Sequence, residues 1–158
     1  MNKFLTAIAA AASLAVAAPA MADPISLDSG NIGDSFVIDL NGFSGSSAGV
    51  VDGLSATLIF TLDSVSGDQY DFSYVVNNTT DGGVTSNISS FAFNVDPDIS
   101  GASSTGAYSY SFVADGVGND PSYPNQIKAV DVCFKAARSG SCSNGGGISE
   151  GGSGNGTL

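Results

Sequence analysis

The sequence of 158 residues contains no histidine and no tryptophan, and Glu150 is its single glutamate. Without histidine, the chain lacks the usual general base near neutral pH and the imidazole ligands of common metal sites. A glycosidase-like pair of carboxylates needs two acids, one of them in an apolar pocket, whereas Glu150 lies in a glycine-rich tail. The sequence therefore predicts a protein that is not an enzyme, with a carboxylate-dependent hydrolase as the least favoured alternative.

Positive charge is scarce as well. Four Lys and Arg residues stand against 15 Asp and Glu residues, which gives a formal net charge of −11. Such a surface repels phosphate backbones and anionic membranes, so we expect no nucleic acid among the partners. Divalent cations would be attracted, although solubility outside the cell is the plainer interpretation of this charge.

The first 22 residues have the pattern of a secretory signal peptide. Lys3 supplies positive charge, Phe4–Ala18 is an apolar run, and Pro19–Ala22 ends in small residues of the A-x-A type. The run is too short to span a bilayer comfortably, and no second apolar stretch follows it. We expect a leader helix that is removed, Asp23 as the mature N-terminus, and a secreted chain without a transmembrane segment.

After the leader, apolar residues recur with a period of two in six stretches, as they do in half-buried strands. These are Ser35–Asn41, Leu54–Asp63, Tyr70–Val76, Phe91–Val95, Tyr108–Phe112 and Ile127–Phe134. Clusters of Asn, Asp, Gly and Pro, the residues of tight turns, separate the stretches. The pattern predicts one all-β domain over residues 23–138, an antiparallel β-sandwich, with a jelly roll or a meander as the alternative.

The end of the sequence changes character. Residues 139–158 are mostly Gly, Ser and Asn, a composition typical of flexible segments. The sequence stops at Thr157 and Leu158, in the middle of an apolar pattern. We therefore expect a flexible segment that leads into missing C-terminal strands and leaves the sheet with an unpaired edge.

Cys133 and Cys142 are the only cysteines. Because extracellular compartments are oxidising, export favours a disulfide between them. Cys133 lies at the end of a predicted strand, and the Gly and Ser residues that follow allow the chain to turn back. Closing this loop would stabilise the fold by about 2.5–3 kcal/mol in the chain-entropy model. Zinc is the poorer interpretation, because two cysteines without histidine provide too few ligands.

Calcium is the one cofactor that the sequence suggests. Two predicted turns hold several side-chain oxygens of the kind that hard cations prefer. They belong to Asp96, Asp98, Asp115, Asn119 and Asp120. No EF-hand loop is present, and the capping of turns by Asx side chains accounts for these residues without a metal. Tyr123 lies between two prolines and is the best candidate for an exposed aromatic that binds a sugar ring.

Several segments of the mature chain resemble those of a known family. They are Asn77-Asn78-Thr79, Ser89–Asp98 and Asp131-Val132-Cys133-Phe134, then Cys142 and the glycine run from Gly145. Together, over roughly Phe60 to Gly156, they resemble the cistern family of bacterial PEP-CTERM proteins. The resemblance implies export by a Gram-negative bacterium that produces exopolysaccharide, with a cell-surface or matrix destination and no known enzyme activity.

The family's further strands, Pro-Glu-Pro motif, membrane helix and basic tail are not in the sequence. Sorting by the exosortase system is therefore implied only if the sequence is a fragment. We expect a non-catalytic structural or adhesive module at the cell surface or in the biofilm matrix, with extracellular polysaccharide or other surface proteins as partners. A carbohydrate- or calcium-binding module is the alternative.

Overall fold

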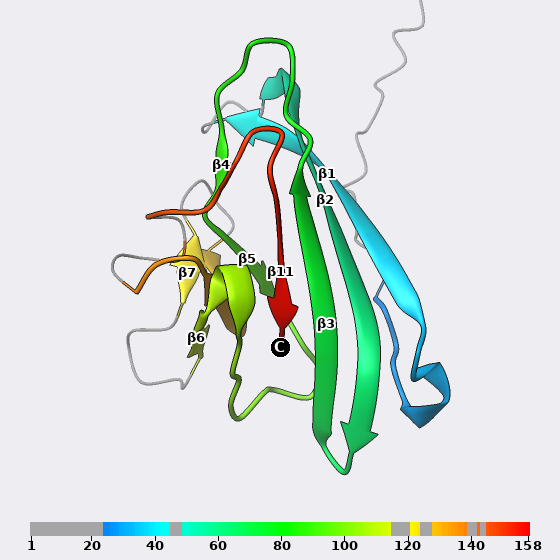
Figure 1. The fold of residues 1–158 in the computed structure, drawn as a ribbon. Coiled ribbons are helices and arrows are strands. Elements are labelled where there is room, and N and C mark those ends of the chain that lie inside the picture. The colour runs from blue at the N-terminus through cyan, green and yellow to red at the C-terminus, as the bar shows by residue number, and fades with distance from the viewer. Residues whose placement is uncertain (1–23, 45–48, 115–120, 124–127, 139–141, 143–144) are drawn as a thin grey trace, which may run out of the picture.

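The computed structural model describes residues 24–44, 49–114, 121–123, 128–138, 142 and 145–158. Within these residues, strands are the main elements, joined by two 3-10 turns, η1 (Ser29–Asn31) and η2 (Gly106–Tyr108). Every strand pair is antiparallel (Figure 1). The predicted all-β class is confirmed. None of the helical turns in the described part is long and apolar enough to cross a bilayer.

A four-stranded sheet dominates the fold, in the order β1-β2-β3-β11. Its strands are β1 (Ser35–Ser44), β2 (Gly49–Ser66), β3 (Gln69–Asn78) and β11 (Ser153–Thr157). The first three follow one another as hairpins, whereas β11 comes from the far end of the sequence and lies beside β3 (Figure 1). Because side chains alternate along a strand, this sheet has an apolar face toward the core and a mostly polar face on the opposite side.

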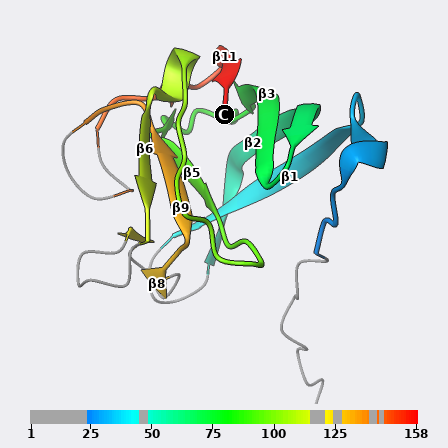
Figure 2. The ribbon, with the colours of Figure 1, turned by 90° about the horizontal axis from the view of Figure 1, so that it is seen from below.

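Shorter strands make up the remainder. A second sheet has the order β5-β9-β6 and consists of β5 (Ser90–Phe93), β9 (Val132–Lys135) and β6 (Tyr110–Val113). Two further pairs are β4 (Asn87–Ile88) with β10 (Ile148–Ser149), and β7 (Ser122–Tyr123) with β8 (Lys128–Ala129). Seen from below, the β5-β9-β6 sheet lies on one side of the four-stranded sheet (Figure 2). The sandwich arrangement within the all-β class stays a prediction.

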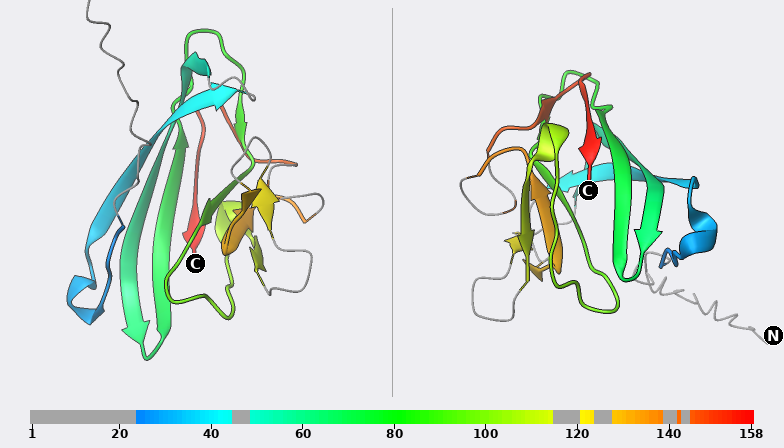
Figure 3. Two further views of the ribbon diagram at one scale, coloured as in Figure 1. Left: turned by 180° about the vertical axis from the view of Figure 1, so that it is seen from behind. Right: turned by 60° about the horizontal axis from the view of Figure 1, so that its bottom comes forward.

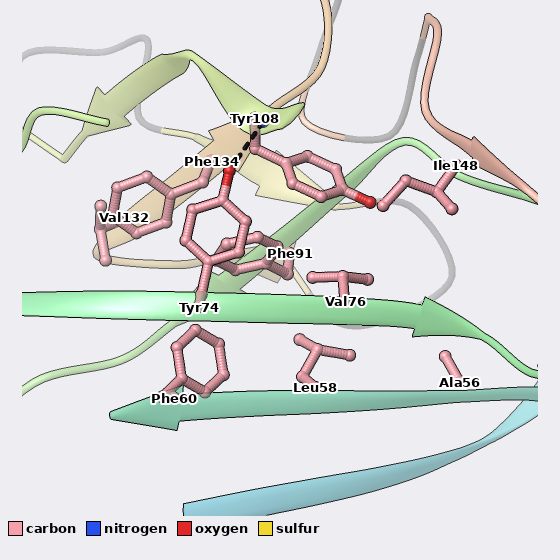
Figure 4. Packing of buried hydrophobic residues seen from close by; sticks show 10 residues of the cluster. All are labelled: Ala56, Leu58, Phe60, Tyr74, Val76, Phe91, Tyr108, Val132, Phe134 and Ile148. Carbon is pink, nitrogen blue, oxygen red and sulfur yellow. Dashed lines mark hydrogen bonds between the residues drawn. The ribbon is translucent and has the colours of Figure 1, made fainter. Parts of the chain in front are cut away.

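The core brings the two sheets together through aromatic rings (Figure 4). The ring of Phe91 in β5 lies 5.6 Å from that of Phe60 and 5.5 Å from that of Tyr74, centroid to centroid. The Tyr74 hydroxyl donates to the carbonyl of Thr105 at 2.8 Å and accepts from the N–H of Tyr108 at 2.9 Å. The hydroxyl is therefore satisfied, and desolvation raises the pKa of Tyr74.

The segment Tyr108–Phe112 does not form the single strand that its alternation predicts. Tyr108 ends η2 and is completely buried, whereas β6 begins only at Tyr110. Tyr110 and Phe112 are 38% and 37% exposed. Tyr108 belongs to the 3-10 turn, and Ser109 after it has φ −85° and ψ 6°, which is not a strand conformation. The two-residue alternation therefore fails at this point, and Tyr108 does not share a face with Tyr110 and Phe112.

The C-terminal segment also differs from its prediction as a flexible extension of the domain. It contains β10 and β11, and β11 completes the four-stranded sheet. Gly154 and Gly156 point to the inner side, where side chains have no room. A Cβ would lie 2.7 Å from the Cβ of Ala107 at Gly154, and 2.6 Å from the Tyr74 hydroxyl oxygen at Gly156. Close packing, rather than flexibility, accounts for these glycines, and the β domain continues past residue 138.

Candidate functional site

The side chains of the four-stranded sheet that point away from the core form an extended surface, which we call the outer face. The register places them in three rows across the strands. The rows are Ser35, Thr61, Ser73 and Thr157; Val37, Ile59, Val75 and Asn155; and Asp39, Thr57, Asn77 and Ser153. All of them are exposed or half-buried. Figure 3 shows from behind how β1, β2, β3 and β11 lie side by side in this sheet.

The spacing of the outer face follows from strand geometry. Neighbouring strands lie about 4.8 Å apart, and residues on the same face of one strand lie about 6.8 Å apart. Two rows are polar, with hydroxyl, amide and carboxylate groups, and the row between them carries three aliphatic side chains. The outer face is therefore a repeating array of hydrogen-bonding groups with an apolar strip along its middle.

Hydrogen bonds between β1 and β2 hold polar side chains on this part of the outer face in place. Ser35 Oγ and Thr61 Oγ1 are 2.7 Å apart, and Thr57 Oγ1 donates to Asp39 Oδ1 at 2.9 Å. Each of these oxygens keeps a further lone pair for an external donor. Because these side chains are already ordered, a ligand that contacts them would lose little of its binding free energy to ordering them.

The structure describes two of the five residues predicted to bind calcium. Asp96 and Asp98 lie in the segment after β5, and both are exposed. Asp115, Asn119 and Asp120 lie outside the described residues. Within the part of the chain that the structure describes, no three His, Cys, Asp or Glu side chains gather as a metal site requires.

Two other predictions fall partly or wholly outside the described part. Tyr123 ends β7, where it pairs with Lys128, but its side chain is not among those described. The predicted leader, residues 1–22, and the predicted new N-terminus Asp23 also lie outside the described residues.

The predicted disulfide is confirmed. Cys133 in β9 is bonded to Cys142, and their Cα atoms lie 6.2 Å apart. Both are buried with Val130 and Ala92 in a small second core, on the side of β9 that faces away from the aromatic cluster. The hydroxyl of Ser90 donates to the Cys142 carbonyl, which ties the loop to β5 as well. The bridge therefore fastens the chain after β9 against the back of the second sheet.

Lys135 lies beside this second core. Its side chain is fully buried, and Nζ lies 5.6 Å from the centroid of the Phe112 ring. Desolvation lowers the pKa of the ammonium group. The position follows from the alternation along β9, since Cys133 and Lys135 share one side and Val132 and Phe134 share the other.

Asn78 is a structural residue that sequence reasoning missed. Its side chain is 2% exposed and lies on the inner side of β3. Nδ2 donates to the carbonyl of Ile148 at 2.9 Å and to Ser86 Oγ at 3.0 Å, while Oδ1 accepts from the N–H of Thr80 at 3.2 Å. The available signal was a polar residue two positions after Val76, on the core side of a predicted strand, because buried amides need partners.

The outer face is thus a largely polar surface that spans four paired strands. It offers repeated donors and acceptors to an extended ligand. Comparison of the chain with models of protein families, with curated proteins and with solved structures gives no match.

Proposed function

We propose that the chain is an exported, non-catalytic structural or adhesive module whose outer face binds extracellular polysaccharide. The observation that carries this proposal is the three-row array on the outer face. Hydroxyl, amide and carboxylate groups complement the hydroxyls of a sugar polymer, because both sides can donate and accept. The aliphatic strip of Val37, Ile59 and Val75 suits the C–H faces of sugar rings.

The charge of the chain narrows the class of polymer. A net charge of −11 repels acidic polysaccharides, so a neutral polymer is the favoured ligand. Asp39 belongs to the outer face and would accept hydrogen bonds from sugar hydroxyls there. An acidic polymer would need bridging cations to reach the same surface.

Export is supported by the Cys133–Cys142 bridge, since structural disulfides persist mainly in oxidising compartments. The signal-peptide pattern of residues 1–22 supports it independently. The resemblance to the cistern family of PEP-CTERM proteins supports a destination at the surface or in the matrix of a Gram-negative bacterium. A Pro-Glu-Pro motif and a membrane helix encoded downstream in the same reading frame would support this destination further.

The binding proposal is tested by co-sedimentation of the purified chain with insoluble cellulose and with the producer's own extracellular polysaccharide. We expect the unmodified chain to be retained by at least one of them. Val75→Glu places a charge in the middle row and should weaken retention about tenfold, because a charge replaces an apolar contact. Val95→Glu is the matched control, since Val95 is 37% exposed and lies outside the outer face.

Circular dichroism of both variants checks that the fold is kept. Loss of binding in Val75→Glu with retention in Val95→Glu supports the outer face as the contact surface. No retention of the unmodified chain on either polymer, or equal retention of both variants, would refute the proposal.

A further inference from the structure

The two edges of the four-stranded sheet differ. At the β11 edge, the N–H of Thr105 donates to the carbonyl of Thr157 at 2.9 Å, and the N–H of Thr157 donates to Thr105 Oγ1 at 3.2 Å. Gly106 lies so close to the carbonyl of Asn155 that a Cβ there would overlap it. The chain therefore closes the β11 edge against the addition of another strand.

At the opposite edge, the backbone of β1 directs its hydrogen-bonding groups outward. The N–H of Leu62 donates to the carbonyl of Asp34 at 3.0 Å, and the register pairs Ser35 with Thr61. In an antiparallel ladder this phase turns the N–H and C=O groups of Ser35, and then of Val37 and Asp39, away from β2. Among the described residues, none provides a backbone partner for these outward groups.

Apolar side chains accompany this open edge on both faces of the sheet. Val37 is 56% exposed on the outer face, and Leu40 is 45% exposed on the inner side. Phe36 and Ile38 are only partly buried against the core. Strands with free backbone groups and exposed apolar side chains are the edges to which other strands add.

We propose that the open edge of β1 binds a second copy of this chain by antiparallel pairing of β1 with β1. The inner-side residues Phe36, Ile38 and Leu40 are symmetric about Ile38, so one register serves both copies. In it, Ile38 faces Ile38, Phe36 faces Leu40 of the second copy, and Val37 exchanges backbone hydrogen bonds with Asp39 of the second copy. A register centred on Asp39 would place two carboxylates opposite each other, which is unfavourable.

Closure of the other edge limits the assembly. Because β11 is covered by the chain itself, pairing through β1 uses the same edge on both copies and stops at two. The result is a two-fold symmetric dimer with one continuous sheet rather than an open filament. The contact uses the backbone edge of β1, so it shares Val37 and Asp39 with the outer face and leaves the outer-face residues of β2, β3 and β11 uncovered.

Charge sets the conditions under which the dimer forms. Each copy carries a net charge of −11, and Asp34 and Asp39 lie at the proposed contact. Repulsion between the copies opposes pairing at low ionic strength and is screened by salt. We therefore expect sodium chloride to strengthen the dimer, whereas salt would weaken the binding of a basic foreign strand to the same edge.

Sedimentation velocity of the full chain over a concentration series, at low and at high sodium chloride, tests the proposal. We expect a monomer–dimer equilibrium that salt shifts toward the dimer. Val37→Pro removes one outward N–H without touching the ladder to β2 and should raise the dissociation constant about tenfold or more. Val37→Ala keeps the N–H and controls for loss of the side chain.

A second pair of variants keeps the test decisive if the proline variant fails to fold. Leu40→Asp puts a charge into the proposed contact, whereas Val50→Asp adds the same charge to β2, where Val50 is already 71% exposed. We expect only Leu40→Asp to weaken the dimer. A monomer at every concentration and salt level would overturn the proposal, and so would a dimer that neither Val37→Pro nor Leu40→Asp weakens. A chain that stays monomeric but still binds polysaccharide would refute the proposed dimer and leave the proposed polysaccharide binding intact.

Discussion

A single buried amide, that of Asn78, holds together segments that are far apart in the sequence. It contacts the carbonyl of Ile148 in β10, the N–H of Thr80 and the hydroxyl of Ser86. The neighbouring Asn77 points to the opposite, outer face. The two residues therefore have the same chemistry in the same strand but different surroundings, which makes them a matched pair for mutation.

We predict that Asn78→Ala lowers the free energy of unfolding by about 2–4 kcal/mol, because it leaves several buried polar groups without partners. Asn77→Ala should cost less than about 1 kcal/mol, because Asn77 is only half-buried and lies on the outer face. Urea denaturation of both variants measures the difference. Equal losses of stability would contradict the role assigned to Asn78.

The pKa of Asp71 offers a second test at a single residue. Its carboxylate accepts from Ser64 Oγ at 2.5 Å and from Gln69 Nε2 at 2.8 Å, and these bonds lower the pKa of Asp71 below 3.8. The stabilising contribution is therefore present above pH 3.8 and is lost as the pH falls through the lower, folded-state pKa. Ser64→Ala should raise the pKa of Asp71, as measured by NMR titration of its carboxyl carbon. An unchanged value would count against the hydrogen bond.

Among the elements, β11 depends on glycine at each inward position. In Gly156→Ala, the new methyl group would meet the hydroxyl of Tyr74 and the carbonyl of Thr105. We predict a loss of roughly 1–3 kcal/mol, as for overpacked sites, and faster hydrogen exchange along β11. Asn155→Ala, on the exposed side of the same strand, should leave exchange nearly unchanged. Similar exchange in the two variants would contradict the packing account.

The disulfide loop is the second element whose contribution can be measured. Replacing both Cys133 and Cys142 by Ala should lower the free energy of unfolding by about 3 kcal/mol. The reason is that the unfolded chain regains the conformational entropy that the closed loop of about ten residues removes. Reducing agent should destabilise the unmodified chain and leave the double variant unaffected. If the reductant acted equally on both proteins, the stabilisation would have another source.

The strands that could be predicted are those whose inward side chains are large and apolar. Phe60 and Tyr74 lie within predicted stretches, and both are buried in β2 and β3. The prediction began β2 too late, because Asp52-Gly53 has the composition of a turn. In the structure, Gly53 adopts φ +84° inside a strand that runs from Gly49 to Ser66. A left-handed glycine thus occurs in a strand as well as in a turn.

Other features could not be predicted from residue patterns. The inward residues of β11 are Gly154 and Gly156, so hydrophobic alternation gives no signal for that strand. The disulfide was predictable, because the sequence has only two cysteines and its leader pattern indicates export to an oxidising compartment. The outer face was not, because its rows depend on the register between four strands, and one of these pairings joins Ser153 to Asn77 across most of the domain.

At the scale of the whole molecule, the two faces and the two edges of the four-stranded sheet differ from one another. One face supplies the aromatic core, and the other presents ordered polar rows. One edge is closed by the turn at Thr105, and along the other no residue that the structure describes pairs with the outward backbone groups of β1. This arrangement, with a net charge of −11 and a buried disulfide, is the basis of the proposed extracellular module.

Export is the central claim, and intact-mass spectrometry of the protein recovered from outside the producing cells tests it most directly. We predict a chain that begins at Asp23 and carries an oxidised Cys133–Cys142 pair. The same chain should be nearly absent from the cytosol. An uncleaved chain with free thiols, found only inside the cells, would contradict the account.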